Sequence, residues 1–344
     1  MKVSSFFQIS VLTILFFYIL LVGRDLLIPF FLALIIWYLV NSLAFICQKM
    51  TLFHRQLSLP LCKILSALIV AAMLSLLAYL VSKNVTDVVT LAPVYQKKLT
   101  ALLFRGLALA GLHNQPSLNQ VFSIIDIGSL ASQLAHVITG FISNTGIILV
   151  YLFFLFMEQK SFSVKYLALI DHSRKQQDIL KIIDKINHEI RVYIGVKSLI
   201  SAITAFLCYL VMISQKLDLA EFWAILIFVL NFIPTVGSLV ANIMPLMFAL
   251  IQFDSALPVV IIGVGIFLTD FLIGNFLDPR LMGEKLNLSP LAIILSLALW
   301  SEIWGIAGMI LCIPLTVIFM IVFSHFPQTR SLAILLSRDG KIVA

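Results

Sequence analysis

Long runs of apolar residues divide the chain into eight hydrophobic elements. They lie near residues 6–22, 26–46, 61–82, 137–157, 193–214, 222–252, 256–276 and 289–324. A helix needs about 20 apolar residues to cross the hydrocarbon core of a bilayer. Because open sheet edges cannot face lipid, each element is predicted to be helical. The pattern therefore predicts an all-α, polytopic integral membrane protein.

Two of these elements are predicted to be broken or re-entrant. In the run 222–252, Pro234 disfavours helix at the preceding residue and Gly237 permits a sharp change of direction. In the run 289–324, the sequence WSEIWG (300–305) interrupts the apolar pattern. A break at membrane depth leaves backbone N–H and C=O groups that protein or a watery cavity must satisfy. We expect two half-helices in the first run, and a re-entrant helix followed by a full span in the second.

Composition excludes a water-soluble domain. The chain is 61% hydrophobic and 11% charged, whereas soluble domains carry roughly 25% charged residues. The net charge of +7 is explained by membrane topology. If both termini lie on the same side of the membrane, 15 of the 23 Lys and Arg residues fall on that side. The positive-inside rule then favours cytoplasmic termini. Nucleic acid is not an expected partner.

We expect residues 1–344 to form a single transmembrane domain. Two segments of it outside the spans are predicted to be amphipathic. Residues 83–135 are expected to form short helices on the outer side. Residues 158–192 are expected to form a cytoplasmic helix, because isoleucines recur at helical spacing. This helix could lie at the interface and lead into the fifth span, or it could serve as a coupling or oligomer-contact helix. Both roles stay open.

Polar residues inside the apolar elements are candidates for a solute or ion pathway. A charged side chain at the bilayer centre costs at least about 2.5–3.5 kcal/mol, so a lipid-facing position is disfavoured. Asp270 could couple protons or cations, or it could hydrogen-bond structurally between helices. Glu302 could occupy a re-entrant tip, or lie at headgroup level beside Trp300 and Trp304. The pathway candidates are Asp270, Glu302, Asn231, Asn242, Pro234 and Gly237.

The segment DPRLMGEKLNLSP (278–290) interleaves charges of both signs with large apolar residues. That mixture favours a segment packed against the protein, with its charges in a polar vestibule, over a plain exposed turn. Ser289 followed by Pro290 predicts a helix N-cap and first helical position. The candidates for a loop motif and gating are Asp278, Pro279, Arg280, Gly283, Glu284, Ser289 and Pro290.

Small residues offer faces for close helix packing. Gly305 and Gly308 form one such face, and Gly263 with Gly265 another. Because these contacts could form within or between subunits, a homo-oligomer is an open expectation. The cysteines are interpreted as small buried hydrophobes without metal-type spacing; they are Cys47, Cys62, Cys208 and Cys312.

Enzymatic motifs are lacking, so no catalytic residue, metal or cofactor is expected. The sequence NHEIRV places Val192 where a zinc protease helix needs its second histidine. The sequence contains no G-x-x-x-x-G-K-[ST] motif, which would indicate ATP binding.

NFIPTVGSLVANIMP (231–245) and DPRLMGEKLNLSPLAIILSLALWSEIWGIAGMILCIPL (278–315) resemble the AI-2E family of bacterial membrane permeases. That family includes exporters of the quorum signal autoinducer-2. The positions that carry the resemblance are Pro234, Gly237, Pro279, Arg280, Gly283, Leu288, Ser289, Pro290, Trp300, Gly305, Gly308 and Pro314. Ser238 departs from the small or proline residue usual after the first break. The likeness spans at least residues 140–325, and the N-terminal third matches in pattern only.

The resemblance implies transport across the bacterial cytoplasmic (inner) membrane, with the lipid bilayer as partner. The expected function is that of a secondary transporter or exporter of a small polar solute, for example a solute like autoinducer-2. Transport would be driven by an ion gradient or would occur by facilitated diffusion. The alternative within this class is a Na⁺(Li⁺)/H⁺ antiporter. The alternative from another class is a non-transporting membrane scaffold or regulatory subunit.

Overall fold

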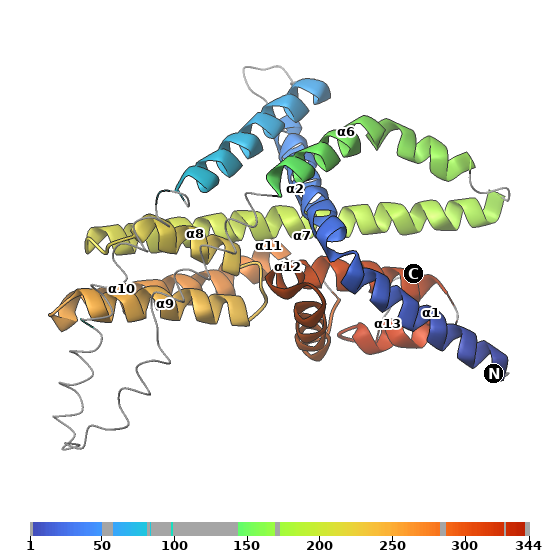
Figure 1. The fold of residues 1–344 in the computed structure, drawn as a ribbon. Helices are drawn as coiled ribbons and strands as arrows, with labels where there is room; N and C mark the ends of the chain where they lie inside the picture. The colour runs from blue at the N-terminus through green and yellow to red at the C-terminus, as the bar shows by residue number, and fades with distance from the viewer. Residues whose placement is uncertain are drawn as a thin grey trace. The chain divides into compact units, whose positions relative to one another are not determined.

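The computed structural model describes residues 3–49, 58–80, 83, 98, 144–168, 173–282, 287–326 and 328–340. The predicted all-α membrane fold is confirmed, because the described chain is almost entirely helical (Figure 1). Five helices in it are long and apolar enough to cross a membrane. Apart from Lys83 and Lys98, the predicted outer segment 83–135 lies outside the described residues.

The helices overlap the predicted hydrophobic elements, and two short helices lie outside them. They are α1 Val3–Val22, α2 Arg24–Lys49, an unlabelled helix Leu59–Leu80, α6 Thr145–Ala168, α7 Ser173–Ser214, α8 Ala220–Leu230, α9 Val236–Gln252, α10 Ala256–Leu272, the π-helical turn η1 Ile273–Leu277, α11 Asp278–Met282, α12 Pro290–His325 and α13 Arg330–Leu336.

The chain forms two compact units, each assembled from separate stretches of sequence. The first unit comprises residues 1–70, 144–198 and 280–344, and the second comprises 71–143 and 199–279. Helix α7 contributes residues to both units. The expectation that the chain works as one transporter domain stays a prediction.

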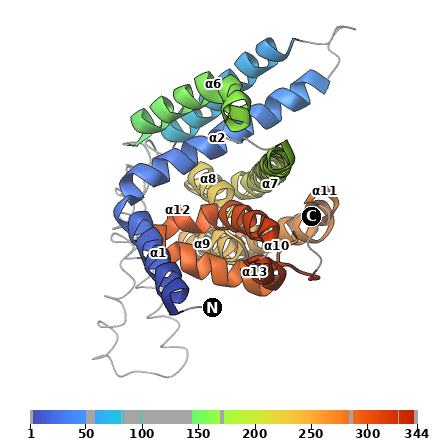
Figure 2. The same ribbon diagram turned by 90° about the vertical axis from the view of Figure 1, so that its right-hand side faces the viewer.

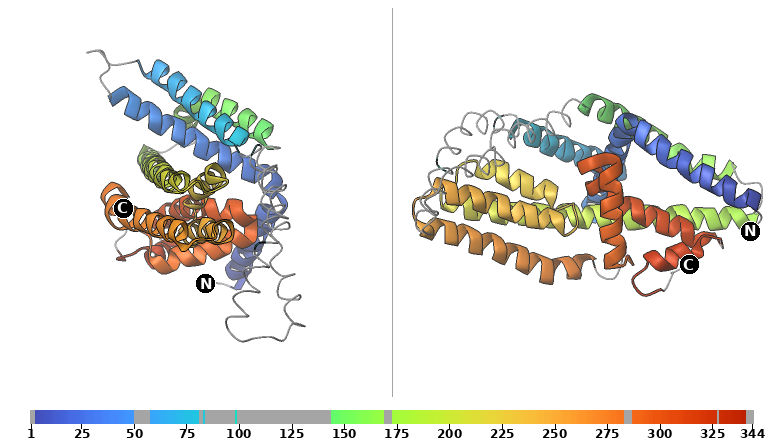
Figure 3. Two further views of the ribbon diagram at one scale, coloured as in Figure 1. Left: turned by 90° about the vertical axis from the view of Figure 1, so that its left-hand side faces the viewer. Right: turned by 60° about the horizontal axis from the view of Figure 1, so that its bottom comes forward.

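In the first unit, α6 packs along α2 (Figure 2), and α13 packs against α12. Helix α12 consists of two helical parts that meet at a sharp kink at Gly305 and run in different directions (Figure 3). Gly305 has φ 60° and ψ −137°, a backbone conformation open essentially to glycine. The predicted interruption of this element is therefore confirmed, and its position is Gly305.

In the second unit, α8, α9 and α10 pack with the second part of α7 around a continuous apolar core (Figure 3). The buried members are Ala205, Cys208, Met212, Leu217, Ala220, Phe222, Trp223, Ile227, Ala241, Ala249, Ile262 and Ile266. Leu230, the last residue of α8, packs against this core.

One expected boundary is wrong. The predicted cytoplasmic helix 158–192 is not a separate element, because α6 ends at Ala168 and α7 runs without interruption from Ser173 to Ser214. The isoleucines that gave the amphipathic pattern lead into buried Ile190 and Ile194. One face of α7 is thus buried where the predicted helix meets the predicted fifth span, and the helix does not end at that point.

Candidate functional site

The predicted break in the run 222–252 is confirmed between α8 and α9. The backbone N–H groups of Asn231 and Ile233 still bond to carbonyls in the last turn of α8, at 3.0 and 2.8 Å. The chain then turns at Thr235, with φ 58° and ψ −58°, while the Val236 N–H bonds to the Pro234 carbonyl. This is the strained form of γ-turn, and such a backbone conformation costs about 1–3 kcal/mol.

Gly237 allows the two half-helices to meet at this break. An ideal Cβ on Gly237 would lie 1.9 Å from the Leu230 carbonyl oxygen and 2.8 Å from the Ile233 Cβ. No side chain fits at those distances, so the start of α9 can contact the end of α8 only where this residue is glycine.

Two predicted pathway residues are brought together beyond the break. The Asn242 Nδ2 on α9 donates to the Asp270 Oδ2 on α10 at 3.0 Å, and both side chains are partly buried. The acid in the middle of an apolar helix therefore has a polar partner from a neighbouring helix, as a carboxyl group at that position requires.

A third helix adds small polar groups that were not among the predicted pathway residues. Ser201, Thr204 and Cys208 are fully buried on one face of α7. Asn231 Nδ2 donates to Thr204 Oγ1 at 3.4 Å, and the Cys208 thiol lies beside the side chain of Thr269, the neighbour of Asp270 in the sequence. The signal that could have revealed them is their spacing of three and four residues.

The structure gives the charged loop motif a different form from the expected one. Residues 278–282 are helical and follow α10 through the π turn η1, in which the Asp278 N–H bonds to the Ile273 carbonyl. Pro279 has no N–H to continue α-helical bonding, and the wider turn precedes it. Pro279 and Arg280 are exposed and Asp278 is partly buried. Gly283 and Glu284 lie outside the described residues, and the gating role stays a prediction.

The end of that motif has the predicted cap. The Ser289 Oγ accepts a hydrogen bond from the Ala292 N–H at 3.1 Å, and Pro290 is the first residue of α12. The segment after α13 runs beside it, because the Ser289 N–H bonds to the Leu336 carbonyl at 2.9 Å and the Arg338 N–H to the Asn287 carbonyl at 3.2 Å. We call residues 336–338 the C-terminal clamp.

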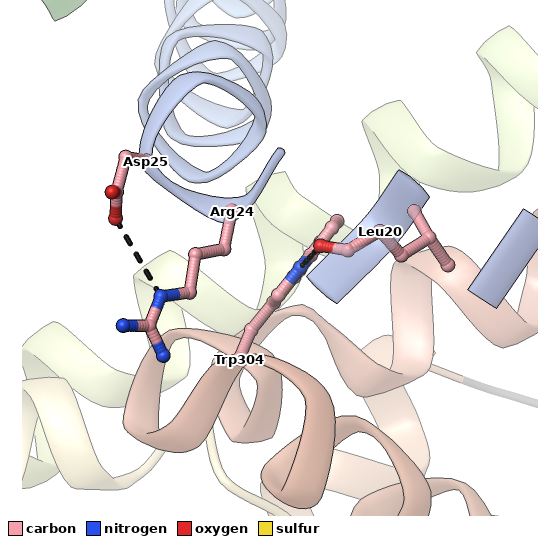
Figure 4. Close-up of polar contacts among 4 residues, drawn as sticks. All are labelled: Leu20, Arg24, Asp25 and Trp304. Atoms are coloured by element: carbon pink, nitrogen blue, oxygen red, sulfur yellow. Dashed lines mark hydrogen bonds and ion pairs between the residues drawn. The ribbon is translucent and has the colours of Figure 1, made fainter. Parts of the chain in front are cut away.

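Glu302 is exposed, whereas Trp300 and Trp304 are buried with ring centroids 5.3 Å apart. The two tryptophans therefore pack into the first unit, and both predicted positions of Glu302 stay open. Trp304 Nε1 donates to the Leu20 carbonyl in the last turn of α1 at 2.9 Å (Figure 4). That carbonyl belongs to a helix end, where acceptors lack intrahelical partners.

Gly305 and Gly308 differ in their surroundings within the chain, and a packing role of Gly305 between subunits stays a prediction. An ideal Cβ on Gly305 would meet no atom of the described residues within 4 Å, so its role is the left-handed bend. At Gly308 a Cβ would lie 1.8 Å from the Trp300 carbonyl oxygen. The absence of a side chain at Gly308 allows the two parts of α12 to pack closely against each other.

The apolar helices, two interrupted spans and polar pairs inside them define a multi-pass helical membrane protein. The sequence profile of the AI-2E family transporter matches residues 8–328, and the chain belongs to this family. It is 30% identical over 324 residues, 93% of this chain and 91% of the relative, to the AI-2 transport protein TqsA of Escherichia coli (strain K12).

Two further relatives agree. A protein of Borreliella burgdorferi that is named as a transport protein is 33% identical over 204 residues, 58% of this chain and 55% of the relative. YhhT of Escherichia coli (strain K12), also named as a transport protein, is 24% identical over 320 residues, 91% of this chain and 88% of the relative. The chain is therefore a membrane permease.

Proposed function

We propose that this permease is a secondary exporter of a small polar solute and that the Asp270–Asn242 pair is the polar centre of its path. The observation that carries the proposal is the 3.0 Å hydrogen bond between these side chains, which come from two apolar helices. The similarity to TqsA, whose name states AI-2 transport, makes an autoinducer-2-like solute the first candidate.

The surroundings of the pair support a path for a polar solute. Asn231 at the end of α8 and the buried hydroxyl of Thr204 extend the polar groups along α7 towards the break. The end of α8 presents the negative end of its helix dipole there, and the start of α9 presents the positive end. Broken helices use such ends to bind polar and ionic groups in transporters.

Asp270 also gives the path a means of ion coupling. Its carboxylate accepts from the Asn242 amide when ionised, and a solute hydroxyl or a cation can replace that amide. Protonation removes the charge that the apolar helix disfavours. Alternating occupancy by a proton and a cation would make the same carboxylate the centre of Na⁺(Li⁺)/H⁺ antiport, the second candidate function.

The test is transport by purified protein in liposomes, comparing wild type with Asp270→Asn. The matched control is Asp254→Asn, which removes an acid that is exposed in the same unit. Asp270→Asn is expected to lower export of labelled autoinducer-2 at least tenfold while the control keeps wild-type export. Equal export by both variants would refute the role of Asp270.

A pH-sensitive dye inside the same liposomes separates the alternatives. Proton movement on addition of Na⁺ or Li⁺, lost in Asp270→Asn, together with silent autoinducer-2 export, would establish the antiporter. Inactivity of the wild type in both assays would favour a scaffold or regulatory subunit. Location in the cytoplasmic membrane with both termini inside completes the proposal.

A further inference from the structure

The crossing of α2 and α7 in the first unit contains more buried hydrogen-bond donors than its bonding pattern uses. The Tyr38 hydroxyl donates to Asn187 Oδ1 at 2.5 Å, and an ideal Cβ on Gly195 would lie 2.4 Å from the Ser42 Oγ. These two contacts place one face of α7 against one face of α2. Arg191 lies on that face of α7, four residues from both Asn187 and Gly195.

One buried N–H group on each of these two helices has no hydrogen-bond partner among the described residues. They are the Nε of Arg191 and the Nε1 of Trp37, each shielded from solvent. Trp37 is only 9% exposed, and its ring packs 4.9 Å from that of Tyr38. A buried donor without a partner destabilises the fold, so such groups are rare in folded proteins and call for an explanation.

Nearby acceptors are already used by other donors. Asn187 Oδ1 accepts from Tyr38, Asn41 Oδ1 accepts from Gln159 Nε2 at 3.3 Å, and the Trp37 carbonyl accepts from Asn41 Nδ2 at 2.8 Å. The Glu158 carboxylate on α6 pairs with Lys165. The named acceptors therefore do not serve the Nε of Arg191 or the Nε1 of Trp37, the neighbour of Tyr38 in the sequence.

We propose that this crossing, with Arg191 and Trp37, is a binding site for an oxyanion such as a phosphate or carboxylate group. The ligand must supply acceptors and negative charge, because both unused groups are donors and one is cationic. A guanidinium binds such groups with strong, charge-assisted hydrogen bonds. The site belongs to the first unit and is independent of Asp270 and Asn242.

The experiment measures thermal unfolding of detergent-purified full-length protein against increasing inorganic phosphate, and separately against short-chain phosphatidylglycerol. A ligand that binds the folded state raises the unfolding temperature with concentration. Stabilisation by inorganic phosphate identifies a free oxyanion as ligand, and stabilisation by the lipid alone identifies a lipid headgroup. Either result supports the site only if it depends on the two donors.

Arg191→Gln is expected to weaken the apparent affinity about tenfold to a hundredfold, from the loss of a charge-assisted hydrogen bond. Trp37→Phe removes only the indole donor and should weaken it about two- to tenfold; it also tests the site if Arg191→Gln does not fold. Arg330→Gln, at an exposed arginine of the same unit, should bind like wild type. Stabilisation that is equal in all four proteins, or absent with both ligands, overturns the proposal.

Discussion

Replacing Gly237 with alanine tests whether the contact between half-helices determines the break. The added methyl group would lie 1.9 Å from the Leu230 carbonyl oxygen and 2.8 Å from the Ile233 Cβ, far inside normal contact distance. Both obstacles belong to the last turns of α8 or to the break itself, so the backbone must move. Overpacking of this kind costs about 1–3 kcal/mol, and the Thr235 turn already carries strain of similar size.

The measurement is the free energy of unfolding in detergent micelles by denaturant titration, with export from liposomes measured in parallel. Gly274→Ala is the matched control, because a Cβ there meets no atom of the described residues within 4 Å. The control should be neutral or more stable by up to about 1 kcal/mol, since alanine favours helix. If Gly237→Ala proved as stable as Gly274→Ala, the inferred contact between α8 and α9 would be wrong.

Three further changes concern α12, each measured by the same titration. Gly305→Ala should lose about 1–3 kcal/mol from backbone conformation alone, because its Cβ meets no described atom; wild-type stability would show that the bend does not need glycine. Ser289→Ala should lose about 0.5–2 kcal/mol with the N-cap bond to Ala292, and Ser289→Thr, which keeps the hydroxyl, should lose less; equal losses would contradict the cap. Trp304→Phe should cost about 1–3 kcal/mol by leaving a buried carbonyl unpaired at Leu20, and an unchanged stability would show that this carbonyl finds another donor.

Local chemistry made several features predictable from the sequence. Pro234 lacks a donor and Gly237 lacks a side chain, and together they indicated the break that separates α8 from α9. Ser289 and Pro290 indicated the start of α12 because capping depends on residues within one turn. In each case the determining atoms lie within a few residues of one another.

Other features depend on contacts between distant segments. Asn242 and Asp270 are 28 residues apart, and no periodicity in the sequence indicates which amide would face the acid. The predicted interruption covered residues 300–305, and the left-handed bend falls at the last of them, Gly305, because backbone freedom decides the position. The tryptophans beside it are buried by tertiary packing, which their flanking sequence does not reveal.

The C-terminal clamp has a consequence for the order of folding during synthesis. Asn287 and Arg338 bond through backbone groups although 51 residues separate them. At 5–20 residues per second, a ribosome needs roughly 3–10 s to make that stretch. Until then the N–H of Ser289 has no Leu336 carbonyl to bond, so the entrance to α12 gains its final partners only after the whole helix has been translated.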